Sequence, residues 1–238
     1  MSKLFLIRHA QASFLSADYD NLSEHGHRQS TALGEYYAKR GLLFDKVYTG
    51  PLRRHHQTYQ RVKEAYEAAS LPFPTAIAYD ELREYEGMDV MGKVRNDLEI
   101  HQPQFKKWFA EMDRQPNHKT KMKMVVTYLN LWATNTLGFA LPEGAQTFAG
   151  FRATAERGLA KVMEGNEKGK TIAAFSSGGC IAAMLGKVMD IQNHGKTMGF
   201  NLVMRNTAIS EVLFSGNRLS LMTFNDLQHL PEEMITTM

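Results

Sequence analysis

Three short stretches of the sequence carry groups that could bind and attack an anion. The first is the pair Arg8-His9, the second is the pair Arg53-Arg54, and the third is the turn at residues 176–179, SSGG. Arginines can neutralise phosphoryl oxygens through bidentate hydrogen bonds, and an imidazole nitrogen can attack phosphorus. The glycines of the turn expose backbone N–H groups at a helix start, where the helix dipole also favours an anion. If the three stretches converge, they form a site suited to a phosphoryl group.

The elements expected before these stretches bring them to one edge of a sheet. Residues 4–7, LFLI, form a short apolar run that is typical of a buried central strand. Residues 44–49 and residues 171–175 are the strands that precede the other two stretches. In open α/β folds, ligands bind at the carboxyl ends of the strands. Taken alone, Arg8 and His9 are also open to a plainer interpretation, as a surface charge and a satisfied polar residue.

Strands and helices alternate along most of the chain. Ser23 is expected to cap a helix that ends at Gly41, after a loop at residues 11–21. The other expected elements are helices at residues 53–69, 147–164 and 180–189, and strands at residues 75–79, 208–214 and 218–224. Residues 215–217, SGN, predict a hairpin between the last two strands. This alternation predicts an α/β sheet with helices on its faces.

Residues 92–141 differ in character from the rest of the chain. They are helical in pattern, rich in lysine, methionine and aromatic residues, and contain no clear strand. We interpret this segment as a helical insertion that covers one end of the sheet. Its lysines, Lys119, Lys121 and Lys123, are expected to form a solvated face, with a wall for an anionic substrate as the alternative.

The composition narrows the class of protein. Hydrophobic residues make up 43% and charged residues 22% of the 238 positions, which is ordinary for a soluble globular protein. The net charge of +3 comes from scattered basic residues, so no nucleic-acid groove is indicated. The single cysteine, Cys180, excludes an internal disulfide and a multi-cysteine metal site and agrees with a reducing compartment. Neither a signal peptide nor a membrane span is indicated, so we expect a cytoplasmic protein without a membrane partner. The oligomeric state remains open.

An acidic loop supplies a candidate proton donor. Residues 81–87, ELREYEG, follow the expected strand at residues 75–79 and so lie near the same edge of the sheet. A carboxyl group kept protonated by partial burial could protonate a departing alkoxide. The alternative is a solvated acidic loop. Neighbouring arginines would keep His9 neutral near pH 7, as a nucleophile requires.

The residues around these groups resemble, in chain order, the motifs of the histidine phosphatase superfamily, in its phosphoglycerate-mutase-like branch. Residues 8–10, RHA, are similar to its Arg-His-Gly signature, and residues 22–29, LSEHGHRQ, to a Leu-Thr-x-x-Gly-x-x-Gln segment. Residues 50–58, GPLRRHHQT, resemble a Ser-Pro-Leu-x-Arg-Ala-x-x-Thr segment, and residues 82–84, LRE, match Leu-x-Glu. Weaker late matches occur at residues 142–144, 151–152 and 206–209. The resemblance covers both ends of the chain and skips only the insertion, which favours the functional interpretation of the Arg-His pair.

The resemblance implies a fold, a reaction and a set of site residues. The fold would be a three-layer α/β sandwich with a mostly parallel central sheet, formed by a single domain over residues 1–238. The reaction would be hydrolysis of a phosphomonoester through a phosphohistidine, without a cofactor or a metal, on a small phosphorylated substrate. The implied site residues are His9 as nucleophile, Glu84 as proton donor, Ser177 as a further catalytic position, and Arg8, Arg54 and Gly178 as phosphate ligands; the partner could also be inorganic phosphate.

The turn at residues 176–179 departs from the superfamily's Ser-His-Gly-Gly turn, because Ser177 stands where the resemblance implies a second catalytic histidine. A serine hydroxyl can donate one hydrogen bond to a phosphoryl oxygen, but it cannot carry the charge of an imidazolium. Loss of one such donor typically costs about 2.7–4 kcal/mol, or roughly a hundred- to thousand-fold in rate. An alternative function is therefore a phosphate-ligand-binding protein with weak or no catalysis. His55 and His56 could substitute because they neighbour Arg54, although surface positions on a helix are the favoured interpretation of both.

Other functional classes receive less support from the sequence. Ala10 and Ala12 replace the glycine and a frequent hydroxyl residue of the first motif. A phosphoglycerate mutase would have to keep water from the phosphohistidine, and the insertion does not show such a lid. Ser177 could itself be a nucleophile, because it lies on a strand-to-helix turn, but the sequence lacks the glycine two residues before it that a nucleophile elbow needs. The pairs His25-x-His27 and His55-His56 have no carboxylate or cysteine partners at metal-ligand spacing, and Cys180 is expected to be a small core residue.

Overall fold

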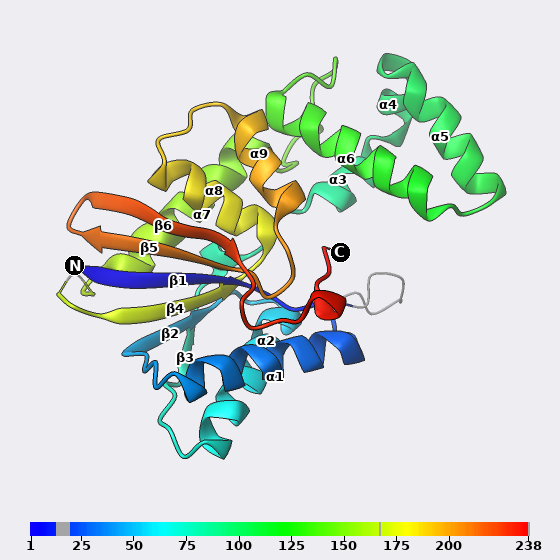
Figure 1. The fold of residues 1–238 in the computed structure, drawn as a ribbon. Coiled ribbons are helices and arrows are strands. Elements are labelled where there is room, and N and C mark those ends of the chain that lie inside the picture. The colour runs from blue at the N-terminus through cyan, green and yellow to red at the C-terminus, as the bar shows by residue number, and fades with distance from the viewer. Residues whose placement is uncertain (13–19, 167, 238) are drawn as a thin grey trace.

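The computed structural model describes residues 1–12, 20–166 and 168–237 of the chain. Within this part of the chain, six strands form one sheet in the order β3-β2-β4-β1-β5-β6 (Figure 1). The strands are β1 (Ser2–Arg8), β2 (Lys46–Thr49), β3 (Ala76–Ala78), β4 (Thr171–Ser176), β5 (Ile209–Ser215) and β6 (Arg218–Asp226). Strands β1 to β4 pair in parallel, and β5 and β6 join as antiparallel partners. The predicted α/β fold with a mostly parallel sheet is confirmed.

Helices cover both faces of this sheet. The helices are α1 (Glu24–Lys39), α2 (Arg53–Ala68), α7 (Phe148–Met163), α8 (Gly178–Val188) and α9 (His194–Val203). Figure 1 shows α1 and α2 on one face and α7, α8 and α9 on the other. The predicted cap of the first helix is confirmed, since the Ser23 hydroxyl accepts a hydrogen bond from the Gly26 N–H at 3.0 Å. Residues 13–19 of the expected loop lie outside the described residues.

The apolar run of β1 is continuous because both faces of this strand are buried. Leu4 and Leu6 belong to the hydrophobic cluster on the α7 and α8 face, whereas Phe5 and Ile7 belong to the cluster on the α1 and α2 face. Side chains alternate between faces along a strand, so four consecutive apolar residues supply two layers of core. The strand is thereby fixed, and the polar residues that follow it are held at the carboxyl edge of the sheet.

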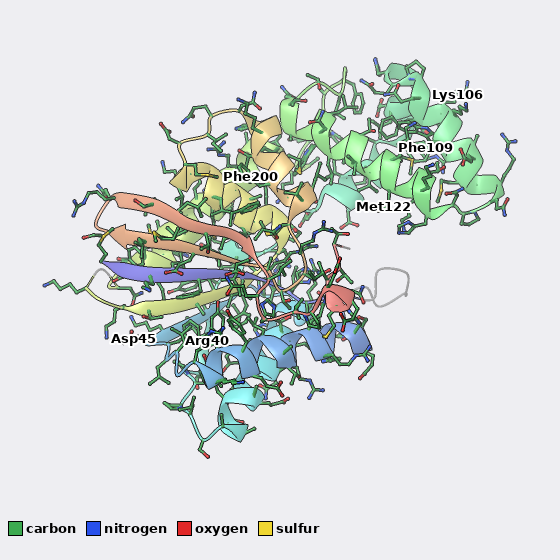
Figure 2. The ribbon with its side chains drawn as sticks, viewed as in Figure 1. Arg40, Asp45, Lys106, Phe109, Met122 and Phe200 are labelled. Carbon is green, nitrogen blue, oxygen red and sulfur yellow. The ribbon has the colours of Figure 1, made fainter. Side chains whose placement is uncertain are left out.

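The segment between the third and fourth strands is helical, as predicted. The part of it that corresponds to the expected insertion comprises α3 (Gly87–Lys93), α4 (Arg95–His101), α5 (Pro103–Arg114) and α6 (His118–Thr134), and it begins a few residues before the expected start. Figure 2 shows that Lys106, Phe109 and Met122 lie on the part of this segment that extends away from the sheet. Its opposite end approaches α9 and the carboxyl edge of the sheet (Figure 1).

Helix α9 is the element that the sequence pattern did not predict. Residues 194–203 contain two glycines and only a narrow apolar stripe, which gives a weak helical signal. The helix forms because the Asn193 side chain caps it, accepting from the Lys196 N–H at 2.9 Å, and because Thr197 and Met198 are buried. Its packing against α6 and α8 therefore outweighs its low propensity.

Candidate active site

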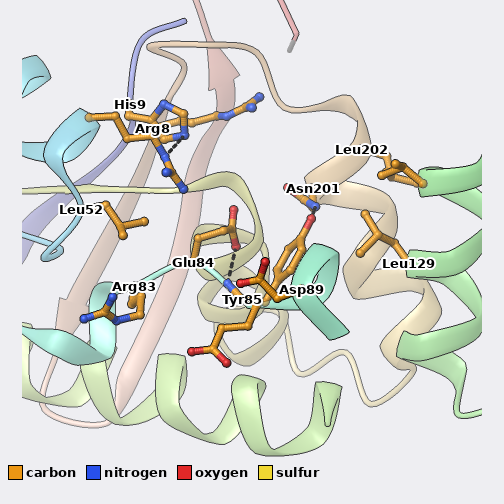
Figure 3. Close-up of a pocket in the computed structure, with 13 residues that line it drawn as sticks. Arg8, His9, Leu52, Arg83, Glu84, Tyr85, Asp89, Leu129, Asn201 and Leu202 are labelled. Atoms are coloured by element: carbon orange, nitrogen blue, oxygen red, sulfur yellow. Dashed lines mark hydrogen bonds between the residues drawn. The ribbon is translucent and has the colours of Figure 1, made fainter. Parts of the chain in front are cut away.

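Residues at or after the ends of the parallel strands β1, β2 and β3 line one pocket of about 340 Å³ (Figure 3). Arg8 and His9 lie at the end of β1, and Arg54 lies at the start of the helix after β2. The lining side chains are Arg8, His9, Leu52, Arg54, Arg83, Glu84, Tyr85, Glu86, Asp89, Val125, Leu129, Asn201 and Leu202. Backbone hydrogen bonds join the strand ends at this edge. The His9 N–H donates to the Ser176 carbonyl at 2.8 Å, and the Gly50 N–H donates to the Phe175 carbonyl at 2.9 Å. The first two stretches therefore meet in this pocket as predicted, whereas the turn at residues 176–179 adjoins it behind the lining, where Ser177 Oγ lies 3.5 Å from Arg54 NH2.

His9 is held between the backbone and a guanidinium. Its Nδ1 lies 2.7 Å from the Ala10 carbonyl oxygen, so the proton of the neutral ring belongs on Nδ1. Its Nε2 then accepts from Nε of Arg54 at 3.2 Å. The opposite side of that guanidinium pairs with Asp20, whose Oδ1 is 2.8 Å from Arg54 NH1. The pairing therefore fixes the guanidinium, and the Nε2 lone pair is directed at Arg54 Nε, which also lines the pocket.

The environment of His9 keeps the imidazole neutral. Only 4% of the residue is exposed. Burial above all, followed by the charges of Arg54 and Arg8 and by His55, holds the pKa of His9 well below its ordinary value. The sequence predicted the effect of the arginines, but burial is the larger cause. In a neutral ring near pH 7, Nε2 carries no proton and keeps the lone pair that a nucleophile needs.

Glu84 lies across the pocket from His9 (Figure 3). Its Oε2 accepts from the Gly179 N–H at 3.1 Å and its Oε1 from the Tyr85 N–H at 3.0 Å. Burial, the largest influence, raises the pKa of this carboxyl above its ordinary value despite these hydrogen bonds and the nearby Arg54 charge. A carboxyl with a raised pKa retains its proton to higher pH than a solvated one. This environment contradicts the alternative of a solvated acidic loop at Glu84.

One backbone N–H of the glycine turn binds a carboxyl group of the protein itself, which corrects one expectation. Both backbone N–H groups were expected to face a substrate, but the Gly179 N–H is occupied by the Glu84 carboxyl group. Position 179 must be glycine, because a Cβ there would overlap the carboxyl oxygen of Glu84 and the ring of Tyr85. Gly178 begins α8 beside Arg8, and a Cβ on it would lie 3.4 Å from Arg8 Nε. Within the turn, Gly178 is therefore the residue that lies beside Arg8, at the cationic end of the pocket formed by Arg8 and Arg54.

Ser177 is fully buried and contacts two side chains of α2. His55 Nε2 lies 2.7 Å from Ser177 Oγ, and Arg54 NH2 donates to the same oxygen at 3.5 Å. The expectation of a surface position is wrong for His55, which has no exposed surface, whereas His56 is exposed. The sequence held a signal for this burial, since His55 falls on the same helical stripe as the buried Tyr59 and Val62.

The outer wall of the pocket comes from segments that the sequence did not connect with the site. Val125 and Leu129 of α6 and Leu202 of α9 form an apolar side. Glu86 and Asp89 add carboxylates at the start of α3. Asn201 and Tyr85 are joined by a hydrogen bond of 3.0 Å from Asn201 Nδ2 to the Tyr85 hydroxyl. Lys119, Lys121 and Lys123 are not among the lining residues, so the alternative of a lysine wall is not supported.

Three other observations bear on the class of protein. No helix within residues 1–12, 20–166 and 168–237 is both long and apolar enough to cross a membrane. Among the described side chains, no group of three or more His, Cys, Asp or Glu residues could hold a metal ion.

Cys180 is buried in the core, as predicted, and burial raises the pKa of its thiol to about 12.

Comparison with known families agrees with this geometry. The model of the histidine phosphatase superfamily, branch 1, matches residues 4–127 and 116–227, which together include both ends of the pocket. The chain belongs to the histidine phosphatase superfamily. The predicted family is thus confirmed. The two matched stretches overlap at residues 116–127, most of which belong to α6, the helix that contributes to the outer wall of the pocket.

Curated relatives of this histidine phosphatase superfamily member match only part of the chain. A 2,3-bisphosphoglycerate-dependent phosphoglycerate mutase from Xylella fastidiosa strain M23 is 29% identical over 120 residues, or 48% of each chain. A second such mutase, from Latilactobacillus sakei, is 37% identical over 78 residues, or 30% of this chain and 34% of the relative. The chain matches about half the length of the Xylella fastidiosa mutase and about a third of the Latilactobacillus sakei mutase.

Solved structures match the fold of this superfamily member over almost its whole length. The phosphoserine phosphatase of Entamoeba histolytica, in complex with 3-phosphoglyceric acid, aligns with a TM-score of 0.63 at 20% identity and covers 97% of this chain and all of its own. The mycobacterial glucosyl-3-phosphoglycerate phosphatase with inorganic phosphate aligns with a TM-score of 0.63 at 17% identity and covers 96% and 99%. At these identities the likeness establishes the fold.

Proposed function

We propose that this protein is a phosphomonoester phosphatase that acts through a phosphohistidine on His9. The observation that carries the proposal is the orientation of His9: its Nδ1 is bound to the Ala10 carbonyl, and its Nε2 lies 3.2 Å from Arg54 Nε in the pocket. A phosphoryl oxygen bound to Arg54 would bring phosphorus next to the Nε2 lone pair. Arg8 lies on the same side of the pocket and adds a second guanidinium.

The reaction would proceed by two displacements. In the first, His9 Nε2 attacks phosphorus, the bond from phosphorus to the leaving oxygen breaks, and Glu84 gives its proton to that oxygen. In the second, water attacks the phosphohistidine while the Glu84 carboxylate takes its proton, which returns free His9, protonated Glu84 and inorganic phosphate. The raised pKa of Glu84 suits a residue that must hold a proton before the first step and recover it in the second.

The outer wall favours hydrolysis over a mutase reaction. A mutase must bind an intermediate with two phosphoryl groups in two orientations, which requires cationic groups at both ends of the pocket. Beyond Glu84, the wall combines apolar Val125, Leu129 and Leu202 with the carboxylates of Glu86 and Asp89, and Arg83 is the cation among these outer lining residues. We therefore expect a small phosphomonoester whose leaving group carries an apolar portion and no second phosphate.

A second candidate function is phosphate-ligand binding with weak or no turnover. The observation that favours it is the hydroxyl of Ser177, a neutral donor, at the turn that faces Arg54. Arg8 and Arg54 would still neutralise a bound phosphoryl group.

A panel of phosphomonoesters separates the two candidates. We expect aryl and apolar alkyl monophosphates to be hydrolysed, 3-phosphoglycerate to be neither isomerised nor efficiently hydrolysed, and inorganic phosphate to raise the melting temperature. Thermal stabilisation by these esters without phosphate release would favour the binding protein. Absence of both stabilisation and hydrolysis across the panel would contradict both functions.

A further inference from the structure

A second buried imidazole lies beside His9 and takes no part in the two displacements. His55 has no exposed surface, and its ring centroid lies 5.7 Å from that of His9. Its Nε2 is 2.7 Å from Ser177 Oγ, a short contact between two fully buried groups. Burial of a polar ring is costly unless it makes hydrogen bonds, so this contact accounts for the placement of the ring.

The Ser177 hydroxyl is buried directly behind the pocket lining and contacts the lining residue Arg54. Arg54 donates from NH2 to Ser177 Oγ at 3.5 Å and from Nε to His9 Nε2 at 3.2 Å. One guanidinium therefore contacts both the proposed nucleophile and the serine oxygen. A phosphoryl group that bound this guanidinium and approached His9 would have an oxygen within reach of the hydroxyl.

Gly50 provides the space that the second imidazole occupies. A Cβ at position 50 would lie 2.7 Å from His55 Cε1 and closer still to Nδ1, distances that real Cβ atoms essentially never show. Gly50, His55 and Ser177 are also three of the positions at which this chain differs from the segments it resembles, which have serine, alanine and histidine there. The structure brings these three differences together, because His55 contacts both of the others.

We propose that His55 is a positioning residue that orients the Ser177 hydroxyl toward the phosphoryl group, so that an imidazole on α2 acts in the site through a serine on the β4–α8 turn. This inference rests on the proposed phosphatase function. Nδ1 of His55 is buried and has no hydrogen-bond partner among the described residues, so the proton of the neutral ring belongs on Nε2. His55 Nε2–H then donates to Ser177 Oγ at 2.7 Å, which leaves the hydroxyl proton for a phosphoryl oxygen. Without His55, the hydroxyl keeps the 3.5 Å contact with Arg54 NH2 and loses the shorter hydrogen bond that directs its proton.

The charges around His55 agree with this arrangement. Burial first, then the Arg54 guanidinium, holds the pKa of His55 well below its ordinary value, with smaller contributions in the same direction from His56 and Arg83. The ring is therefore neutral near pH 7. A bound phosphoryl dianion favours protonation of this ring. The positive charge of the ring then stabilises, through the Ser177 hydroxyl, the negative charge that develops on the phosphoryl group.

Replacement of His55 tests the inference directly. With an aryl phosphate as substrate, His55→Ala is expected to lower kcat by about 100-fold while KM changes by less than about 3-fold, because an interaction made in the transition state is lost. His55→Gln, which can also donate to Ser177 Oγ, is expected to recover at least a tenth of the wild-type kcat. His56→Ala is the matched control, since this exposed neighbour is outside the pocket lining, and its kcat is expected to equal that of the wild type.

Moving the imidazole distinguishes orientation of Ser177 from a purely structural role. The double variant His55→Ala, Ser177→His places the ring on the turn in the space that His55 vacates, and we expect its kcat to exceed that of His55→Ala by at least 10-fold. Gly50→Ala should lower kcat strongly when His55 is present, but not in the double variant. Wild-type kcat in His55→Ala, or a double variant and a His55→Gln variant no better than His55→Ala, would overturn the inference.

Failure of the inference is distinguishable from failure of the proposed function. If the wild type hydrolyses phosphomonoesters in a His9-dependent manner and His55 variants are unaffected, the inference alone fails. If no phosphomonoester is hydrolysed by the wild type, the proposed function fails, and the inference fails with it. If His55→Ala does not fold, His55→Gln is compared with the wild type, and a folded His55→Gln with less than a tenth of the wild-type kcat would overturn the inference.

Discussion

Replacement of His9 with alanine is expected to lower kcat for phosphomonoester hydrolysis by on the order of 10⁴-fold or more, as loss of a nucleophile does in enzymes with covalent intermediates. The neighbouring imidazole of His55 cannot replace His9 as the nucleophile, because His9 Nε2 faces Arg54 in the pocket whereas His55 Nε2 is directed at Ser177. The measurement is steady-state release of phosphate from an aryl phosphate by wild type and His9→Ala at equal concentration.

The binding of phosphate provides the control for this variant. Arg8 and Arg54 remain in His9→Ala, so inorganic phosphate should still raise its melting temperature. Loss of catalysis with retained stabilisation would show that the pocket survives the substitution. Full activity in His9→Ala would contradict the mechanism.

Replacement of Glu84 with glutamine is expected to have the next largest effect, a loss of roughly 10²–10⁴-fold in kcat for alkyl phosphates, whose leaving oxygen needs a proton. The loss should be smaller in the first displacement with an aryl phosphate whose leaving group departs without protonation. Glu81→Gln is the matched control, because Glu81 belongs to the same loop but pairs with Lys161 and is not among the pocket-lining residues. Comparison of alkyl and aryl substrates in both variants measures the effect.

The pH dependence of the wild type gives an independent test of Glu84. The first displacement needs the protonated carboxyl, so kcat for an alkyl phosphate should fall as pH rises through the pKa of Glu84. Burial raises that pKa, so the decline should begin at a higher pH than for a solvated glutamate. The decline should be absent in Glu84→Gln. A pH profile that is identical in the two proteins would contradict the role of Glu84.

The elements with strong local signals were predictable from the sequence. The buried strand β1 follows from an apolar run, the start of α1 from the Ser23 cap, and the last hairpin from Gly216 between two alternating strands. Because parallel strands share one carboxyl edge, these local predictions also placed His9, Arg54 and the glycine turn in a common site.

The rest of the site depends on contacts between distant segments. Helix α9 carries Asn201 into the pocket although its own helical pattern is weak, since packing against α6 and α8 supports it. The ion pair of Arg54 with Asp20 and the hydrogen bond of Gly179 with Glu84 each join residues more than thirty positions apart. His55 was assigned to the surface because its type is polar, although the period of α2 placed it on the buried stripe.

The most direct test of the central claim is the identity of the phosphorylated residue during turnover. Glu84→Gln, incubated with a radiolabelled aryl phosphate and quenched rapidly, should accumulate a phosphoenzyme, because its first displacement needs no proton while the second lacks its base. We expect the label to be acid-labile and base-stable, to map to the peptide that contains His9, and to be absent when His9→Ala is added. An acid-stable, base-labile label on Ser177, or a label that persists in the His9→Ala background, would contradict the account.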